Sequence, residues 1–312
     1  MIKRFYLRRE FAIFVALIIM IAVFSVINPI YLTPQNFLDI VEQSTINGLV
    51  AIGITFAIIT AGIDLSVGST LAIVIIGVGM LVVGGIPPIL GAILGVVMGL
   101  ILGLVNGLLV TKMHLQPFIA TLGMMSVYRG VAYVITKGWP VLNIPSRFRT
   151  MLDGEFLFRI PFSVLILFGF AFLGFVLLKH TRFGTYLYAM GGNEEATRLS
   201  GVNVALNKMF AYGFCGIGAA LSGMVLLARL GTGEPTAGQG YELNAIAAAA
   251  IGGTSLAGGK GSMLGTLLGA ILLSALKVGL IVAGVDTFWQ FIATGLIIVV
   301  AAYFEIIQQR IK

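Results

Sequence analysis

Long uninterrupted apolar runs restrict the fold of this chain more than any other feature of its sequence. A helix that crosses a bilayer needs about 20 mostly apolar residues, with a range of about 17–25. Only 10% of the residues are charged, whereas a soluble domain carries about 25%. We therefore predict an all-α, polytopic transmembrane helical bundle that forms one domain over residues 1–312. Its ten expected spans are 11–27, 48–63, 70–86, 89–110, 118–135, 162–178, 209–228, 245–257, 263–283 and 288–304.

The distribution of positive charge predicts the orientation of the bundle. Lys and Arg concentrate on the cytoplasmic side of membrane proteins. If residues 1–10 lie inside and the spans alternate, the inner segments hold 12 basic residues and the outer segments 5. Arg129 and Lys277 then lie within spans. This assignment places both termini and the loop 179–208 inside, and the loop 136–161 outside. The net charge of +7 is thus explained by topology rather than by nucleic acid.

Two of the expected spans, 48–63 and 245–257, are short and lead into polar stretches that contain glycine. Broken spans often form the working part of a transporter, because irregular backbone is tolerated in a membrane only where it lines a cavity or is buried in protein. The similarity of the two breaks suggests two related halves with broken helices. We expect a pathway or gate at these breaks, with the candidate residues Gly62, Asp64, Ser66, Gly68, Ser69, Thr254 and Ser255.

Asp64 is the one acid that this assignment places near the membrane interior. An intramembrane acid suggests a pathway role, but Asp64 or Ser66 could instead cap the helix that begins there. A proton- or sodium-coupled carrier normally needs further acids within its spans. An intramembrane enzyme needs a nucleophile–base pair or a His/Asp cluster. Neither pattern appears in the sequence, so we expect no catalytic residue and no metal site.

Each of the two longest loops carries a distinctive local pattern. In 179–208, Asn193 could cap a short helix whose first turn holds Glu194 and Glu195, and Gly201 could end it. This pattern is equally typical of a helix that binds a soluble partner and transmits its movement, and of a solvated connecting loop. The loop 136–161 is basic although it is assigned to the outside, so it could contact lipid headgroups or an acidic partner. Its candidate docking residues are Arg147, Arg149 and Arg159.

Three long strings, 61–69, 191–204 and 234–262, resemble the membrane permease subunits of ribose-type sugar importers powered by ATP. The resemblance runs over nearly the whole chain in order. It implies a permease without a catalytic site or cofactor of its own, in the bacterial inner (plasma) membrane, for a monosaccharide such as ribose. The implied partners are a second permease subunit in a homodimer, a cytoplasmic ATP-binding subunit that holds ATP and Mg²⁺, and a periplasmic or lipid-anchored sugar-binding protein.

The loop 179–208 also resembles, in part, the coupling loop of bacterial importers, whose pattern is Glu-Ala-Ala-x-x-x-Gly. This chain has Thr197 in place of the second alanine and lacks the Leu-Pro ending of that pattern. The resemblance implies that the loop contacts the ATP-binding subunit through Asn193, Glu194, Glu195, Ala196, Thr197 and Gly201. The resemblance to sugar importers implies a sugar-binding protein on the outer face, and the positive charge of the periplasmic loop 136–161 predicts that this protein docks there.

Overall fold

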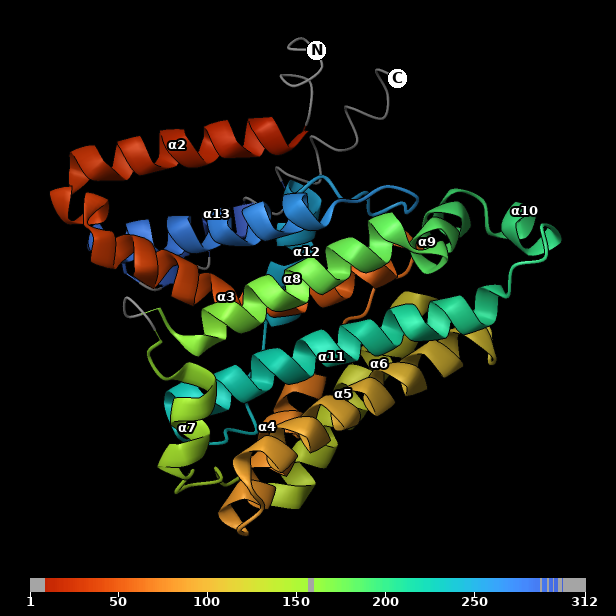
Figure 1. Cartoon of the computed structure of the whole chain (residues 1–312), viewed down its shortest axis with the longest axis horizontal. Coiled ribbons are helices and arrows are strands. Elements are labelled where there is room, and N and C mark those ends of the chain that lie inside the picture. Colours follow the sequence, from red (N-terminus) through yellow and green to blue (C-terminus); the bar gives the residue numbers. More distant parts are fainter. Residues whose placement is uncertain are drawn as a thin grey trace.

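The computed structural model describes residues 9–156, 160–286, 288–290, 292–293, 295–296 and 299. Over these residues the chain forms helices joined by short connections, as Figure 1 shows. In chain order the elements are α2 (Arg9–Ile27), η1 (Pro29–Leu32), α3 (Pro34–Ile59), α4 (Val67–Val83), α5 (Pro88–Thr111), α6 (Pro117–Thr136), α7 (Ser146–Asp153), α8 (Phe162–His180), α9 (Arg182–Gly192), α10 (Glu194–Leu199), α11 (Val204–Leu230), α12 (Tyr241–Ile251) and α13 (Met263–Val282).

The prediction of a polytopic helical membrane protein is confirmed. Within the described residues, α3, α5, α6, α8, α11 and α13 are long and apolar enough to cross a membrane. Shorter apolar helices lie at Phe11–Ile27, Val67–Val83 and Tyr241–Ile251. Nine expected spans thus correspond to helices. The tenth, 288–304, falls largely outside the described residues, so the number of ten stays a prediction.

The second expected span was drawn too short. Helix α3 begins at Pro34, where the Oγ1 of Thr33 accepts a hydrogen bond of 3.3 Å from the N–H of Asn36. The first half of α3 contains polar residues, so the apolar run in the sequence begins later than the helix does. One of these polar residues, Glu42, pairs with Arg229 of α11 at 3.4 Å. Helix α3 therefore also carries Asp39 and Glu42, two acids that the expected span 48–63 left outside it.

Helix α11 runs lengthwise through the bundle and packs closely on α5. Glycines recur every four residues along α5, and from Gly95 to Gly107 this stripe faces α11. A Cβ atom built on Gly99 would collide with the carbonyl oxygen of Gly216, and one on Gly103 would collide with that of Tyr212. Small residues of this kind let transmembrane helices approach until their backbones touch. The position of α11 is thereby fixed by contacts that tolerate no added side chain.

The two ends of the bundle carry different surface elements. Figure 1 shows α7 at one end, and α9 and α10 at the opposite end. Helix α11 connects them, since it begins beside α10 and ends beside α7. We call these the α7 end and the α10 end.

Candidate functional site

The two short helices α4 and α12 begin at the same place inside the bundle. Gly68, in the first turn of α4, lies so close to Gly238 and Glu242 that a Cβ at Gly68 would collide with both. Gly238 and Gly240, at φ 78° and 80°, shape the turn from which α12 starts. The positive ends of both helix dipoles therefore converge. In many secondary transporters with broken helices, helix starts of this kind point at the anionic groups of the substrate.

The first predicted break is confirmed, since α3 ends at Ile59 and α4 begins only at Val67. The second is confirmed as well, since α12 ends at Ile251 and α13 begins only at Met263. This break touches the first one, because the N–H of Gly259 donates to the carbonyl of Ile59 at 2.9 Å. The start of α12, Tyr241, also lies near the first break and is reached through the loop 231–240. The expected span 245–257 therefore began and ended several residues too late. The reason is that Glu242 and Asn244 belong to the helix although they are polar.

Arg129 links the two helix starts. It lies near the middle of α6, and its Nη1 donates hydrogen bonds to the carbonyl oxygens of Pro235 (2.6 Å) and Ala237 (2.7 Å). Its Nη2 donates to the carbonyl of Gly68 at 3.3 Å. One guanidinium thus fastens the loop before α12 to the first turn of α4. The sequence placed Arg129 within a span, and an arginine in an apolar helix was the signal that could have marked it as a site residue.

A cavity of about 270 Å³ opens beside this junction. Ser69 is only 1% exposed there, and its Oγ has no hydrogen-bond partner among the described residues. The carboxylate of Glu242 accepts one hydrogen bond, of 3.2 Å, from the N–H of Gly240. Donors and acceptors from three segments therefore meet around one space. The cavity is lined by Ser69, Met125, Ser126, Arg129, Gln239 and Glu242.

Asp64 belongs to a buried network on the other side of the first break. It is 1% exposed, and its Oδ1 accepts hydrogen bonds from the N–H (2.9 Å) and the Oγ (2.7 Å) of Ser66. Asn106 of α5 donates to Asp64 Oδ2 at 3.2 Å and to Ser66 Oγ at 2.7 Å. Tyr128 of α6 donates to the Asn106 side-chain oxygen at 3.2 Å. Asp64 thus stabilises the turn that leads into α4. It accepts a hydrogen bond from the N–H of Ser66, which precedes the helix, and α4 has no side-chain cap. The pathway role of Asp64 stays a prediction.

The other predicted pathway residues lie apart from the cavity. Gly62 lies against the hydroxyl of Tyr212, without room for a side chain. The hydroxyls of Thr254 and Thr266 are 3.4 Å apart, and Ser255 donates its N–H to the carbonyl of Lys260 at 2.9 Å. These contacts hold the loop 252–262 in place near the end of α3. Of the predicted set, Ser66, Gly68 and Ser69 lie at the start of α4, but only Ser69 lines the cavity. Arg129, Gln239 and Glu242, which also line it, were missed.

Gly68 is required for a different reason than a turn glycine would be. A glycine at a break in a span is expected to take a positive φ or to allow the close approach of another segment, but the structure gives Gly68 helical backbone within α4. What excludes a side chain there is the close approach of Gly238 and Glu242. The expectation of close approach is confirmed, and the expectation of positive φ is wrong.

The short helix at the α10 end forms as the sequence predicts. The Oδ1 of Asn193 accepts a hydrogen bond of 2.9 Å from the N–H of Ala196, and Gly201 takes a φ of 84° after the helix. Glu194 turns inward and pairs with Arg198 (3.0 Å) and Lys208 (2.5 Å). The outward face therefore consists of other residues: Glu195 is exposed, and the side chain of Leu199 is 83% exposed.

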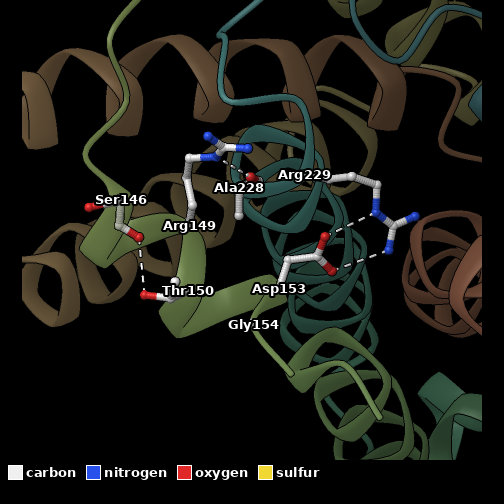
Figure 2. A pocket seen from close by; sticks show the side chains of 7 residues that line it. All are labelled: Ser146, Arg149, Thr150, Asp153, Gly154, Ala228 and Arg229. Atoms are coloured by element: carbon white, nitrogen blue, oxygen red, sulfur yellow. Dashed lines mark hydrogen bonds and ion pairs between the residues drawn. The ribbon is translucent and has the colours of Figure 1, made fainter. Parts of the chain in front are cut away.

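At the α7 end, the basic loop contains a helix that is fixed to the end of α11. Figure 2 shows Asp153 of α7 in a two-point ion pair with Arg229, with N–O distances of 3.2 and 3.3 Å. The Nε of Arg149 donates to the carbonyl of Ala228 at 3.1 Å. Arg149 thus binds the C-terminus of α11, where the helix dipole favours a cation, so part of its guanidinium is already used within the chain. Arg147 is exposed, and Arg159 lies outside the described residues.

Comparisons with known proteins agree with this architecture. Residues 36–301 match the family described as "Branched-chain amino acid transport system / permease component". The chain is 43% identical over 294 residues to the ribose import permease protein RbsC of Bacillus subtilis (strain 168), covering 94% of this chain and 91% of that protein.

Two further relatives come from Escherichia coli (strain K12). The ribose import permease protein RbsC is 43% identical, with 92% of this chain and 90% of the relative covered. The D-allose transport system permease protein AlsC is 36% identical, with coverage of 94% and 90%. No solved structure matches the chain. With most of its length matched by the family and by these relatives, the chain belongs to this family of membrane permease components.

Proposed function

We propose that the chain is the permease subunit of an ATP-driven importer that takes up a monosaccharide, with ribose as the first candidate. The observation that carries this proposal is the 43% identity to proteins named ribose import permease, over more than nine-tenths of this chain. The junction of α4 and α12 supports it, because two helix starts with polar side chains around a cavity suit the passage of a polar molecule. The chain itself performs no catalysis and holds no cofactor.

The partners bind at opposite ends of the bundle in this proposal. A cytoplasmic ATP-binding subunit, which holds ATP and Mg²⁺, binds the α10 end, where Glu195 and Leu199 face outward from a capped helix. A periplasmic or lipid-anchored sugar-binding protein binds the α7 end, where Arg147 is exposed. A second copy of the permease completes the pathway. The chain then lies in the bacterial inner membrane with both termini in the cytoplasm.

Uptake in reconstituted vesicles tests the proposal. The permease, its ATP-binding subunit and its sugar-binding protein are placed in liposomes, and entry of radiolabelled ribose and allose is followed. Uptake should require ATP on the side of the ATP-binding subunit and should stop with a hydrolysis-deficient form of that subunit. Uptake driven by a proton or sodium gradient without ATP would instead identify a secondary carrier, and the proposal would be wrong.

A further inference from the structure

We propose that the cavity between α4, α6 and α12 is a transient binding site for the sugar during its passage through the permease. The inference rests on the proposed function and goes beyond it by naming the residues that receive the substrate. Those residues are Ser69, Ser126, Arg129, Gln239 and Glu242, which line the cavity. Its volume is about 270 Å³, near the lower end of the roughly 300–1,000 Å³ that is typical of small-molecule sites.

The first argument is the hydroxyl of Ser69. The great majority of buried polar side-chain atoms in proteins have a hydrogen-bond partner. Ser69 lines the cavity at 1% exposure, yet its Oγ has no partner among the described residues. A hydroxyl can both donate and accept a hydrogen bond. The group that matches it best is another hydroxyl, which is what a sugar presents.

The second argument is the balance of charge and of hydrogen-bonding groups. Arg129 directs three of its donors to the carbonyls of Pro235, Ala237 and Gly68, which leaves two of the five N–H donors of a guanidinium. Glu242 supplies an acceptor of opposite charge, and Gln239 supplies both donors and an acceptor. Because the charges of Arg129 and Glu242 offset each other, the lining favours a neutral molecule rich in hydroxyls over an ion.

The third argument is the backbone around the cavity. The residues that precede α4 and α12, Ser66 and Gly240, make no side-chain capping bond. The first turns of a helix carry N–H groups without partners inside the helix, and here two such turns meet at one point. They add positive potential for the oxygen atoms of a sugar. Met125 lends the cavity an apolar side chain against which the C–H groups of the ring can lie.

The site must hold the sugar weakly. Conduction through a binding site requires an affinity high enough for entry and low enough for release. The protein groups that bind the sugar also fasten α4 to the loop before α12. Movement of these two helix starts relative to each other therefore changes the site, and the sugar is released as the site loses its shape.

The matched variants Ser69→Ala and Ser163→Ala test the site. Ser163 of α8 is also buried with an unpartnered Oγ, but it does not line the cavity. In the reconstituted transporter, Ser69→Ala should lower the ribose uptake rate by about threefold to tenfold, the cost of one hydrogen bond. Gln239→Ala, at an exposed position of the cavity, should do the same. Ser163→Ala should leave unchanged both the uptake rate and the ATPase rate stimulated by the loaded binding protein.

A labelling experiment reads the site without transport. The single native cysteine, Cys215, is fully buried, so a cysteine introduced by Ser126→Cys is the accessible thiol among the described residues. In the complex with the ATP-binding subunit, millimolar ribose should slow the reaction of this thiol with a polar maleimide. It should not slow the reaction of Val127→Cys, the adjacent exposed position of α6.

The outcomes separate the two proposals. If the wild-type transporter takes up no sugar with ATP, the proposed function fails. If it takes up ribose but Ser69→Ala and Gln239→Ala behave as Ser163→Ala does, the proposed function stands and the cavity is not the sugar site. Equal labelling of Ser126→Cys with and without ribose, in an active transporter, overturns the site as well.

Discussion

Replacement of Arg129 by glutamine should destabilise the bundle, because Arg129 holds two helix starts together. Arg129→Gln removes three hydrogen bonds to carbonyl oxygens, of 2.6, 2.7 and 3.3 Å. Polar contacts inside membrane proteins are worth about 0.6 kcal/mol on average and about 1.7 at most. Three of them therefore predict a loss of about 2–5 kcal/mol in the free energy of unfolding.

Arg129→Lys separates the geometry of the side chain from its charge. An ammonium is a compact point charge, whereas the planar guanidinium fork can reach several acceptors at once. Lysine should therefore recover less than half of the loss. The matched control is Arg147→Gln on the exposed surface of α7, where a substitution should change stability by less than about 0.5 kcal/mol.

Reversible unfolding in mixed micelles of increasing SDS content, followed by the fluorescence of the two tryptophans, measures these differences. Uptake assays on the same preparations report whether the junction also matters for transport. If Arg129→Gln or Arg129→Lys unfolds at the same SDS content as the wild type, the three hydrogen bonds do not brace the junction and the reasoning is refuted.

Three further predictions concern the breaks and the two ends. Gly68→Val should abolish uptake, because its Cβ would collide with Gly238 and Glu242. The control is Gly123→Val in α6, where a Cβ meets open space. Equal uptake by both variants would contradict the packing argument. Glu195→Lys should abolish sugar-stimulated ATP hydrolysis without unfolding the protein, since Glu195 faces outward, and an unchanged ATPase rate would count against a coupling role. Arg147→Glu should slow association of the binding protein at low ionic strength and not at high, because rim charges steer encounter and are screened by salt; equal association rates at low salt would exclude Arg147 from docking.

The elements that could be predicted are those whose causes are local in the sequence. The apolar runs gave most helices, because hydrophobicity over about 20 residues decides membrane insertion. Helix α10 was predictable because its cap, its acidic first turn and its terminal Gly201 lie within nine positions. The first half of α3 was missed because its polar residues are matched by a distant helix, as Glu42 is by Arg229.

The candidate site was predicted only in part, for a related reason. Gly68 and Ser69 were found because they follow a visible break in a span. Gln239 and Glu242 lie some 170 residues further along the chain, and nothing in their local pattern shows that they meet Gly68. That contact depends on the loop 231–240, which Arg129 anchors through two carbonyl oxygens. Every residue has a backbone carbonyl, so the sequence does not show which carbonyl oxygens will accept hydrogen bonds from Arg129.

The attachment of α11 at both of its ends has a mechanical consequence. Its first turn is tied to α10 through Lys208 and Glu194, and its last turn to α7 through Arg229 and Asp153. A helix of 27 residues is a rod about 40 Å long that resists both stretching and compression, because either would distort its backbone hydrogen bonds. A displacement of one end along the helix axis is therefore expected to move the other end as well, so that α7 and α10 shift together.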